Sequence, residues 1–247
     1  DANEQVGETT AGAENGRHGE ARHVVTEDEL LVGFSPRAWL VIGSVGRYGR
    51  TNLHTDAIEA ALVAGTWRAP RAGDTVTLPN GAVRTWEPAE TGTDGKLAHE
   101  ALGGGYAFTT VVLPETAGPT AMVLEARGHS VAYVDGVPRA GDPYANGAGR
   151  LPILLQPGEN ELLLLCPRGE VDIKLRPATG PAALDVVDLT LPDLIVDEPT
   201  ATWLGVPVLN TTAEWLAGLA IETVAPDGTT TRTDIPPLPP LTRRKCA

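Results

Sequence analysis

Short apolar or alternating runs, separated by turn residues, recur along the chain from about residue 38 onward. The four residues Trp39 to Ile42 are continuously apolar and end at a glycine, which is typical of a strand buried in a core. Residues 75–78 and 82–86 alternate between apolar and polar side chains on either side of Pro79-Asn80-Gly81. This arrangement predicts a β-hairpin.

Further runs rich in β-forming residues follow at close spacing; they cover residues 106–113, 121–126, 131–134, 151–155, 161–166 and 171–175. One helix of about two turns is predicted after Asp56, a suitable N-cap, because Ile58, Ala61 and Leu62 fall at helical spacing. Many short strands with turn signals between them are typical of a β-sandwich or jelly roll. We therefore predict an all-β protein with a jelly-roll β-sandwich over residues 30–178.

The first 25 residues differ from the rest of the chain in composition. Residues 1–25 are rich in Glu, Gly and Ala and contain almost no large apolar side chain. Such a segment cannot bury enough surface to offset the entropy of ordering it. We expect residues 1–25 to be an acidic tail or linker that adds nothing to the stability of the fold.

A stretch rich in Pro, Gly and Ala at residues 176–184 separates the sandwich from a shorter region, residues 185–247. Three strands are predicted there, at residues 186–191, 203–209 and 216–224, before the chain becomes rich in proline. Three strands form half of an immunoglobulin-like sandwich, and half a sandwich lacks a second sheet to cover its apolar face. Trp203 or Trp215 should therefore be covered by residues outside 185–247 or lie exposed on an open face.

The net charge of −13 argues against nucleic acid as a partner, because phosphates would repel the chain and Arg243-Arg244-Lys245 is its one cationic cluster. No run approaches the ~20 apolar residues of a membrane span. Cys166 and Cys246 are too few for a disulfide framework, and Cys166 follows four leucines as a small buried apolar residue would. We predict no signal peptide in this sequence, which begins at Asp1 as a processed mature form or a trimmed one would.

No motif in the chain predicts catalysis. Gly128-His129-Ser130 has the first half of a nucleophile elbow, but Ala132 replaces the last glycine, and a strand follows instead of a helix. A polar turn between two strands is the favoured interpretation. The glycine-rich stretch at residues 43–49 has the wrong spacing for a dinucleotide site, and the histidines lack the spacing of zinc ligands. No catalytic residue and no resident cofactor is therefore predicted.

Three residues are candidates for a carbohydrate contact: Trp86, Asp142 and Tyr144. Trp86 precedes Glu-Pro and could remain partly exposed, and Tyr144 lies in a loop beside Asp142. An exposed aromatic face can pack on a sugar ring while a carboxylate accepts hydrogen bonds from its hydroxyl groups. Asp135 and Asp142 also flank a turn-rich loop that could bind calcium through carboxylate and carbonyl oxygens. Ordinary packing and turn formation explain the same residues.

Two segments and the first predicted strand carry a resemblance to a known family. Residues 132–144 begin Ala-Tyr-Val-Asp-Gly, and residues 151–162 contain Leu-Gln-Pro-Gly-Glu-Asn before an apolar strand. With Trp39 to Gly43, they resemble the galactose-binding-like jelly-roll modules attached to bacterial glycoside hydrolases and esterases. Asp135 stands where those modules usually have Asn. The motifs consist of strands and turns, so the resemblance implies architecture more than function.

The later part of the chain, residues 191–245, is similar to the region that precedes the catalytic domain in large secreted prolyl-oligopeptidase-like and esterase-like α/β-hydrolases. This resemblance implies a non-catalytic accessory region of a secreted, periplasmic or cell-surface hydrolase. Its partner would be a catalytic domain in the same precursor or in another chain. A free carbohydrate-binding module and a structural surface or adhesion protein are the alternatives, and sugar titration separates the first of these from the rest.

Overall fold

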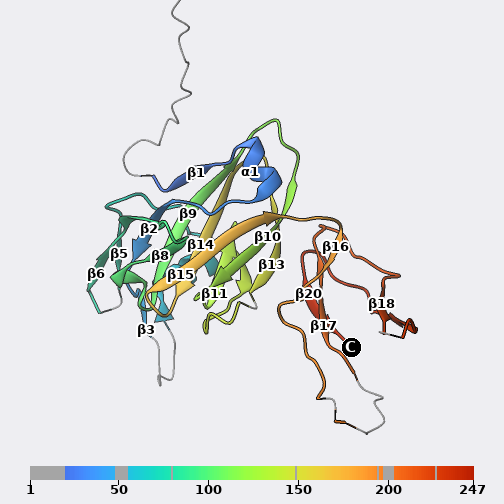
Figure 1. Cartoon of the computed structure of the whole chain (residues 1–247). Coiled ribbons are helices and arrows are strands. Elements are labelled where there is room, and N and C mark those ends of the chain that lie inside the picture. Colours follow the sequence, from blue (N-terminus) through green and yellow to red (C-terminus); the bar gives the residue numbers. More distant parts are fainter. Residues whose placement is uncertain are drawn as a thin grey trace, which may run out of the picture.

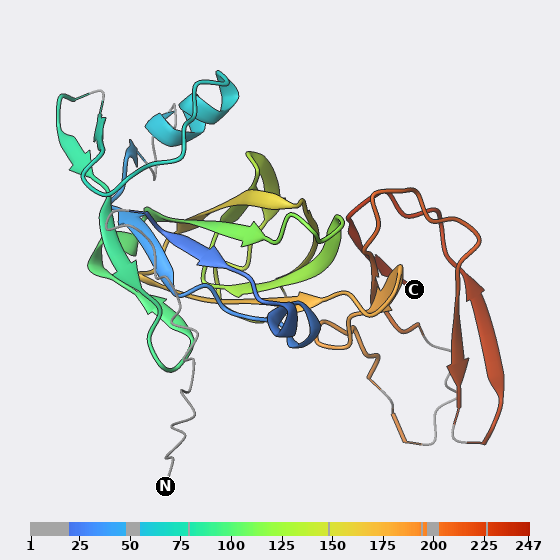
Figure 2. The same ribbon diagram turned by 90° about the horizontal axis from the view of Figure 1, so that it is seen from above.

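The computed structural model describes residues 20–47, 55–78, 80–147, 149–193, 195–196, 203–225 and 227–247. A two-sheet sandwich occupies most of this length, and a smaller C-terminal lobe lies beside one end of it (Figures 1 and 2). The predicted all-β sandwich is confirmed. None of the described helices is long and apolar enough to cross a membrane.

The larger sheet of the sandwich has one central strand, β9, that pairs with strands from three parts of the chain. Its order is β12 (Val137–Ala140), β11 (Val131–Val134), β14 (Gly158–Cys166), β9 (Gly105–Leu113), β2 (Ala38–Ile42) and β7 (Glu87–Glu90). The smaller sheet has the order β13 (Arg150–Leu155), β10 (Thr120–Arg127), β15 (Glu170–Pro177) and β8 (Lys96–Ala98). The short helix η1 (Glu100–Leu102) leads into β9.

The continuous apolar runs arise because both faces of the larger sheet are buried. Side chains alternate across a strand, so Trp39 and Val41 of β2 join the core between the two sheets. Leu40 and Ile42 point the other way, into a second core on the outer face. The same alternation divides the leucines of β14. A strand with two buried faces needs apolar residues at every position.

The described parts of the segment between β2 and β7, residues 46–47, 55–78 and 80–86, supply the cover for this outer face. They form β3 (Gly46–Arg47), β4 (Thr55–Asp56), α2 (Ala57–Val63) and the hairpin of β5 (Thr75–Thr77) and β6 (Val83–Thr85). The predicted helix and hairpin are thus confirmed, and Asp56 caps α2 by accepting hydrogen bonds from the amides of Ile58 and Glu59, both at 2.9 Å. Hydrogen bonds from Tyr133 to Glu59 and from Trp67 to Glu161 fasten this cover to the sheet.

The tail predicted over residues 1–25 is too long at its C-terminal end. Arg22–Val24 forms β1, which pairs in parallel with Thr110 to Val112 of β9. Ala21 and Val25 are buried on either side of it. The composition of the segment does not predict this strand, because only two small apolar side chains, those of Ala21 and Val25, are buried there. The strand is held mainly by backbone hydrogen bonds to β9. Residues 1–19 lie outside the described residues.

A second helix, α1 (Glu27–Val32), is also absent from the sequence prediction. Thr26 and Glu29 form a capping box at its start. Leu31 and Val32 are exposed, and Leu30 alone of its leucines packs against the core. The helix therefore lacks the apolar stripe that reveals an amphipathic helix in a sequence.

The C-terminal lobe has a three-stranded sheet with the order β16 (Ala182–Leu184), β17 (Val206–Asn210) and β20 (Arg243–Cys246), and a hairpin of β18 (Ala220–Val224) and β19 (Thr230–Asp234). The strands predicted at 203–209 and 216–224 are present in shortened form. The one predicted at 186–191 is wrong: residues 186–189 form no strand, and Thr190 makes a single bridge to Gly205. β16 falls in the predicted linker, so the lobe begins before residue 185.

Candidate functional site

Trp86, the first residue predicted to contact carbohydrate, is buried in the outer core and only 2% exposed. Its ring meets the rings of Trp67 and Phe108 edge to face, with centroids 6.5 and 6.4 Å apart. This aromatic cluster packs the cover onto the larger sheet. The prediction that Trp86 is accessible to a ligand is therefore wrong, because Trp86, between β6 and β7, packs its side chain into the outer core.

Asp142 and Tyr144 lie together in the loop between β12 and β13, apart from the Trp86 cluster. The Asp142 carboxylate is buried and accepts hydrogen bonds from the amides of Asn146 and Gly147, at 3.0 and 2.7 Å. It holds the loop and has little capacity left for a ligand. Tyr144 is 69% exposed, and the Arg168 guanidinium lies 5.0 Å from its ring centroid. Of the three predicted residues, Tyr144 alone is accessible.

The two predicted calcium ligands lie at opposite ends of one hairpin. Asp135 occupies the turn between β11 and β12, with a φ of 49°, and accepts a hydrogen bond from the Glu161 amide at 2.7 Å. Burial raises the pKa of Asp135 above its ordinary value. Asp142 follows the far end of β12, about 13 Å away for a four-residue strand. The two carboxylates cannot share an ion, and the described residues contain no group of three or more potential metal ligands.

The segment Gly128-His129-Ser130 forms the turn between β10 and β11, as the sequence predicts. Gly128 has a φ of 87° and the Ser130 amide donates to the Leu165 carbonyl at 2.7 Å. The His129 ring is fully buried, and the neighbouring Asp142 carboxylate and Ala140 backbone offset only part of the cost of charging it. Burial lowers the pKa of His129 to about 4, since the charged ring would lose its hydration. His129 therefore acts as a neutral packing residue.

The C-terminal lobe carries most of the exposed apolar side chains of the described chain. Trp203 is 76% and Trp215 is 63% exposed, which confirms that at least one of these tryptophans lies on an open face. The lobe's own core is small and consists of Val208, Ile235, Leu238 and Cys246. We call the following residues the exposed apolar set: Leu184, Val186, Val187, Leu191, Ile195, Val196, Trp203, Trp215 and Val224.

A buried ion-pair network joins the lobe to the sandwich. The Asp185 side chain is fully buried where the chain leaves β16, and its oxygens lie 3.3 Å from Arg150 Nη1 and 3.2 Å from Arg243 Nε. Arg150 belongs to β13 of the sandwich and Arg243 to β20 of the lobe. One carboxylate thus bridges the two units at the point where β13 lies beside the β17–β20 pair (Figure 1).

Second carboxylates extend this network on both sides. Glu125 accepts from Arg150 and Arg176 of the sandwich, at 3.2 and 2.8 Å. In the lobe, Asp188 accepts from Arg243 and Lys245, and these hydrogen bonds hold the pKa of Asp188 below its ordinary value. The cationic cluster noted in the sequence is therefore a structural element. Its acidic partners are Asp185 and Asp188. The sequence signals this network only through two closely spaced acidic residues at 185 and 188 and a basic run of opposite charge at 243–245.

No protein-family model matches this chain, and none of the curated proteins matches its sequence. Solved structures give a distant likeness. A GH2 β-galacturonidase from Eisenbergiella tayi, bound to galacturonate, aligns at a TM-score of 0.31 and 14% identity over 87% of this chain and 35% of its own. The exo-β-D-glucosaminidase CsxA aligns at 0.30 and 11% identity, over 87% of this chain and 28% of its own. The chain thus spans about a third of the length of these structures.

Proposed function

We propose that this chain is a non-catalytic accessory β-sandwich region of a hydrolase that acts outside the cytoplasm. It docks on a catalytic domain in the same polypeptide or in a partner chain, and it shields, orients or pre-binds substrate for that domain. The observation that carries the proposal is the contrast between the sandwich, which has two complete cores, and the C-terminal lobe, which exposes its apolar set.

Exposing a tryptophan side chain to water costs free energy, and a partner that covers the side chain recovers it. A fully buried tryptophan hides about 150–250 Å² of surface, and each Å² of apolar surface removed from water contributes about 25 cal/mol. Covering Trp203 and Trp215, which are mostly exposed, would therefore contribute several kcal/mol to association. Tryptophan is also among the residues that dominate protein–protein binding energies. The lobe has the composition of a docking surface.

The ion-pair network gives the docking surface a fixed place relative to the sandwich. Asp185 connects β13 of the sandwich to β20 of the lobe. A catalytic domain that docks on the lobe would therefore face the sandwich in a defined orientation. Such rigidity is what an accessory region needs in order to position substrate.

One observation favours a carbohydrate-binding module as the second candidate. Tyr144 exposes most of its ring, and the Arg168 guanidinium covers part of it at 5.0 Å. An exposed ring next to a hydrogen-bond donor can contact the apolar face and a hydroxyl group of a sugar. Calorimetric titration with neutral oligosaccharides tests this, with Tyr144→Ala expected to lose the binding that Tyr133→Phe, on the buried side of β11, would keep.

Hydrogen–deuterium exchange tests the docking proposal. The chain alone should be compared with the chain joined to, or mixed with, a candidate hydrolase domain. We expect peptides that contain Trp203 and Trp215 to exchange more slowly in the larger assembly. Trp203→Asp and Trp215→Asp should restore fast exchange, whereas Leu31→Asp, an equally exposed leucine on α1, should have no effect.

Two results would contradict the proposed function. Equal exchange of the two tryptophan peptides in all samples would show that the exposed apolar set docks on nothing in the assembly. Hydrolysis of p-nitrophenyl esters, glycosides or peptide amides by the chain alone, abolished by Ser130→Ala, would show that the chain is itself the enzyme.

A further inference from the structure

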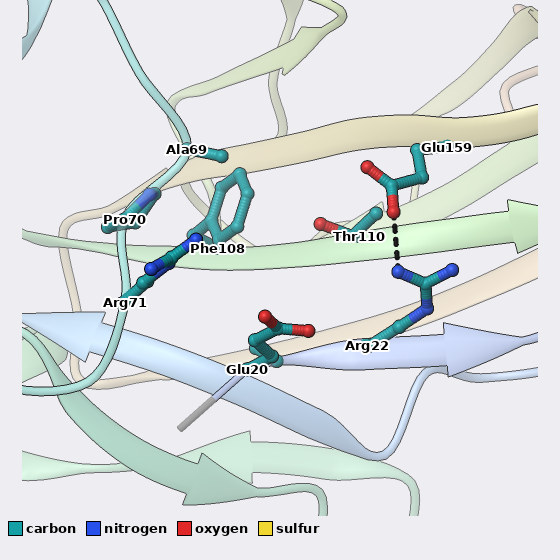
Figure 3. Close-up of a pocket in the computed structure, with 9 residues that line it drawn as sticks. Glu20, Arg22, Ala69, Pro70, Arg71, Phe108, Thr110 and Glu159 are labelled. Atoms are coloured by element: carbon teal, nitrogen blue, oxygen red, sulfur yellow. Dashed lines mark hydrogen bonds and ion pairs between the residues drawn. The ribbon is translucent and has the colours of Figure 1, made fainter. Parts of the chain in front are cut away.

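A pocket of about 290 Å³ opens on the outer face of the larger sheet, beside residues 69–71 of the cover (Figure 3). Phe108 and Thr110 of β9 form its floor. The loop of residues 69–71 forms one wall, and residues 20–22 with Glu159 of β14 form the other. The volume is just below the range of small-molecule sites, which begins near 300 Å³, and suits a small ligand.

Some polar side chains that line this pocket form hydrogen bonds or ion pairs with other residues, and others do not. Arg22 and Glu159 form an ion pair across the strands, drawn as a dashed line in Figure 3. The side chains of Glu20, Arg71 and Thr110 have no hydrogen-bond or ion-pair partner in the part of the chain that the structure describes. Figure 3 shows Glu20 and Arg71 reaching into the same space from opposite walls. The pocket therefore presents one unpaired positive charge and one unpaired negative charge.

We propose that this pocket binds a small zwitterion of the α-amino acid class with an uncharged side chain. The Arg71 guanidinium would donate two parallel hydrogen bonds to the α-carboxylate, the geometry that guanidinium and carboxylate groups share. The α-ammonium group would donate to the Glu20 carboxylate and the Thr110 hydroxyl. The side chain of the ligand would lie against Phe108 and Pro70, which supply the apolar surface of the pocket.

Charge balance distinguishes this ligand from other classes. The ion pair of Arg22 with Glu159 is neutral in sum, so Glu20 and Arg71 determine what the pocket attracts. A simple anion would be repelled by Glu20, and a simple cation by Arg71. A neutral sugar would leave both charges without an opposite charge. A zwitterion offers a partner to each, and this inference holds whether or not a hydrolase domain docks on the C-terminal lobe.

The test is a titration of the whole chain with L-leucine and three comparison compounds, in which binding is measured by calorimetry or by ligand-observed NMR. L-leucine should bind saturably at one site with a dissociation constant in the millimolar range. L-leucinamide, which lacks the carboxylate, and N-acetyl-L-leucine, which lacks the ammonium group, should each bind at least tenfold more weakly. D-glucose should not bind to this site.

Variants locate the binding. Arg71→Ala and Glu20→Gln should each weaken L-leucine binding at least tenfold, and Thr110→Val by a smaller factor. Arg68→Ala is the matched control for Arg71, because Arg68 is also exposed but donates to the Trp67 carbonyl and does not line the pocket. Glu27→Gln, on α1, is the control for Glu20. Unchanged thermal midpoints confirm that all five variants are folded.

Several outcomes would overturn the proposal. Absence of saturable binding by L-leucine and by a panel of other uncharged amino acids would do so. Equal binding of leucine, leucinamide and the N-acetyl compound would show that the pocket does not recognise the α-carboxylate and α-ammonium charges of the ligand. Glucose binding that Arg71→Ala removes would assign the pocket to neutral sugars instead, and equal losses in Arg71→Ala and Arg68→Ala would place the binding elsewhere.

Discussion

Replacing Asp185 by Asn tests whether the buried ion-pair network holds the C-terminal lobe to the sandwich. The Asp185 side chain is fully buried and faces two guanidinium groups, from Arg150 at 3.3 Å and from Arg243 at 3.2 Å. Asn has the same shape and can still accept the hydrogen bond from the Val187 amide, which is 3.0 Å long. The substitution therefore removes the charge and leaves the packing and the local turn intact.

The expected loss of stability is about 3 kcal/mol. Two opposite charges about 4 Å apart attract each other by about 4 kcal/mol at an effective dielectric constant of about 20, and the carboxylate loses its hydration in return. Removing one member of a buried pair usually costs about 3–5 kcal/mol, because the partner charge stays behind. Arg150 retains Glu125 and Arg243 retains Asp188, so we expect the lower end of this range.

Urea denaturation followed by tryptophan fluorescence measures the effect, because urea, unlike guanidinium chloride, does not screen charges. Asp193→Asn is the control, since Asp193 is exposed on the same lobe and its loss removes the same charge. A double-mutant cycle of Asp185→Asn with Arg150→Met should give a coupling energy of about 1.5 kcal/mol or more. A loss below about 0.5 kcal/mol, the usual range of surface substitutions, would refute the reasoning.

Four further predictions concern residues whose environment differs from the one that the sequence suggests. Burial holds the pKa of His129 at about 4, below the ordinary 6.5, so the native ring stays neutral. The free energy of unfolding should therefore fall by roughly 3 kcal/mol between about pH 6.5 and pH 4, and His129→Leu should flatten this slope in urea titrations at each pH. Trp86→Ala should cost about 3–5 kcal/mol in the same assay, and Trp86→Phe should leave any sugar affinity unchanged. Removal of residues 1–19 should leave the thermal midpoint unchanged, whereas removal of residues 1–25 should lower it by several degrees, because β1 and its buried flanks are lost. Asp142→Ala should destabilise the protein by about 1–2 kcal/mol, equally with calcium and with a chelator, because the carboxylate binds backbone amides; a calcium-dependent difference would restore the calcium hypothesis.

The pattern of apolar and polar residues by itself determined that the protein consists of short strands packed as a sandwich. Alternation over residues 75–78 and 82–86, and continuous apolar residues at 39–42, are local signals, and β5, β6 and β2 form where they predict. The sequence also predicted that Trp203 or Trp215 would be either covered from outside the C-terminal region or exposed, because a count of strands shows how much sheet is available to cover an apolar face, and both side chains are exposed.

Tertiary structure alone decided which face of each strand meets which partner. Alternation predicts that the two faces differ, yet both faces of the larger sheet are buried, because the described part of the segment between β2 and β7 folds over one of them. Trp86 is inaccessible for this reason, although its local sequence resembles that of an exposed residue.

Charged residues depend on tertiary structure even more strongly. Asp185 lies 35 residues from Arg150 and 58 from Arg243, and no local pattern records that the three will meet. The pocket likewise joins residues 20–22, residues 69–71, Phe108, Thr110 and Glu159. Hydrophobic periodicity is imposed by the repeat of the backbone and can be read along the chain, whereas contacts between single polar side chains arise only where the folded backbone brings distant segments together.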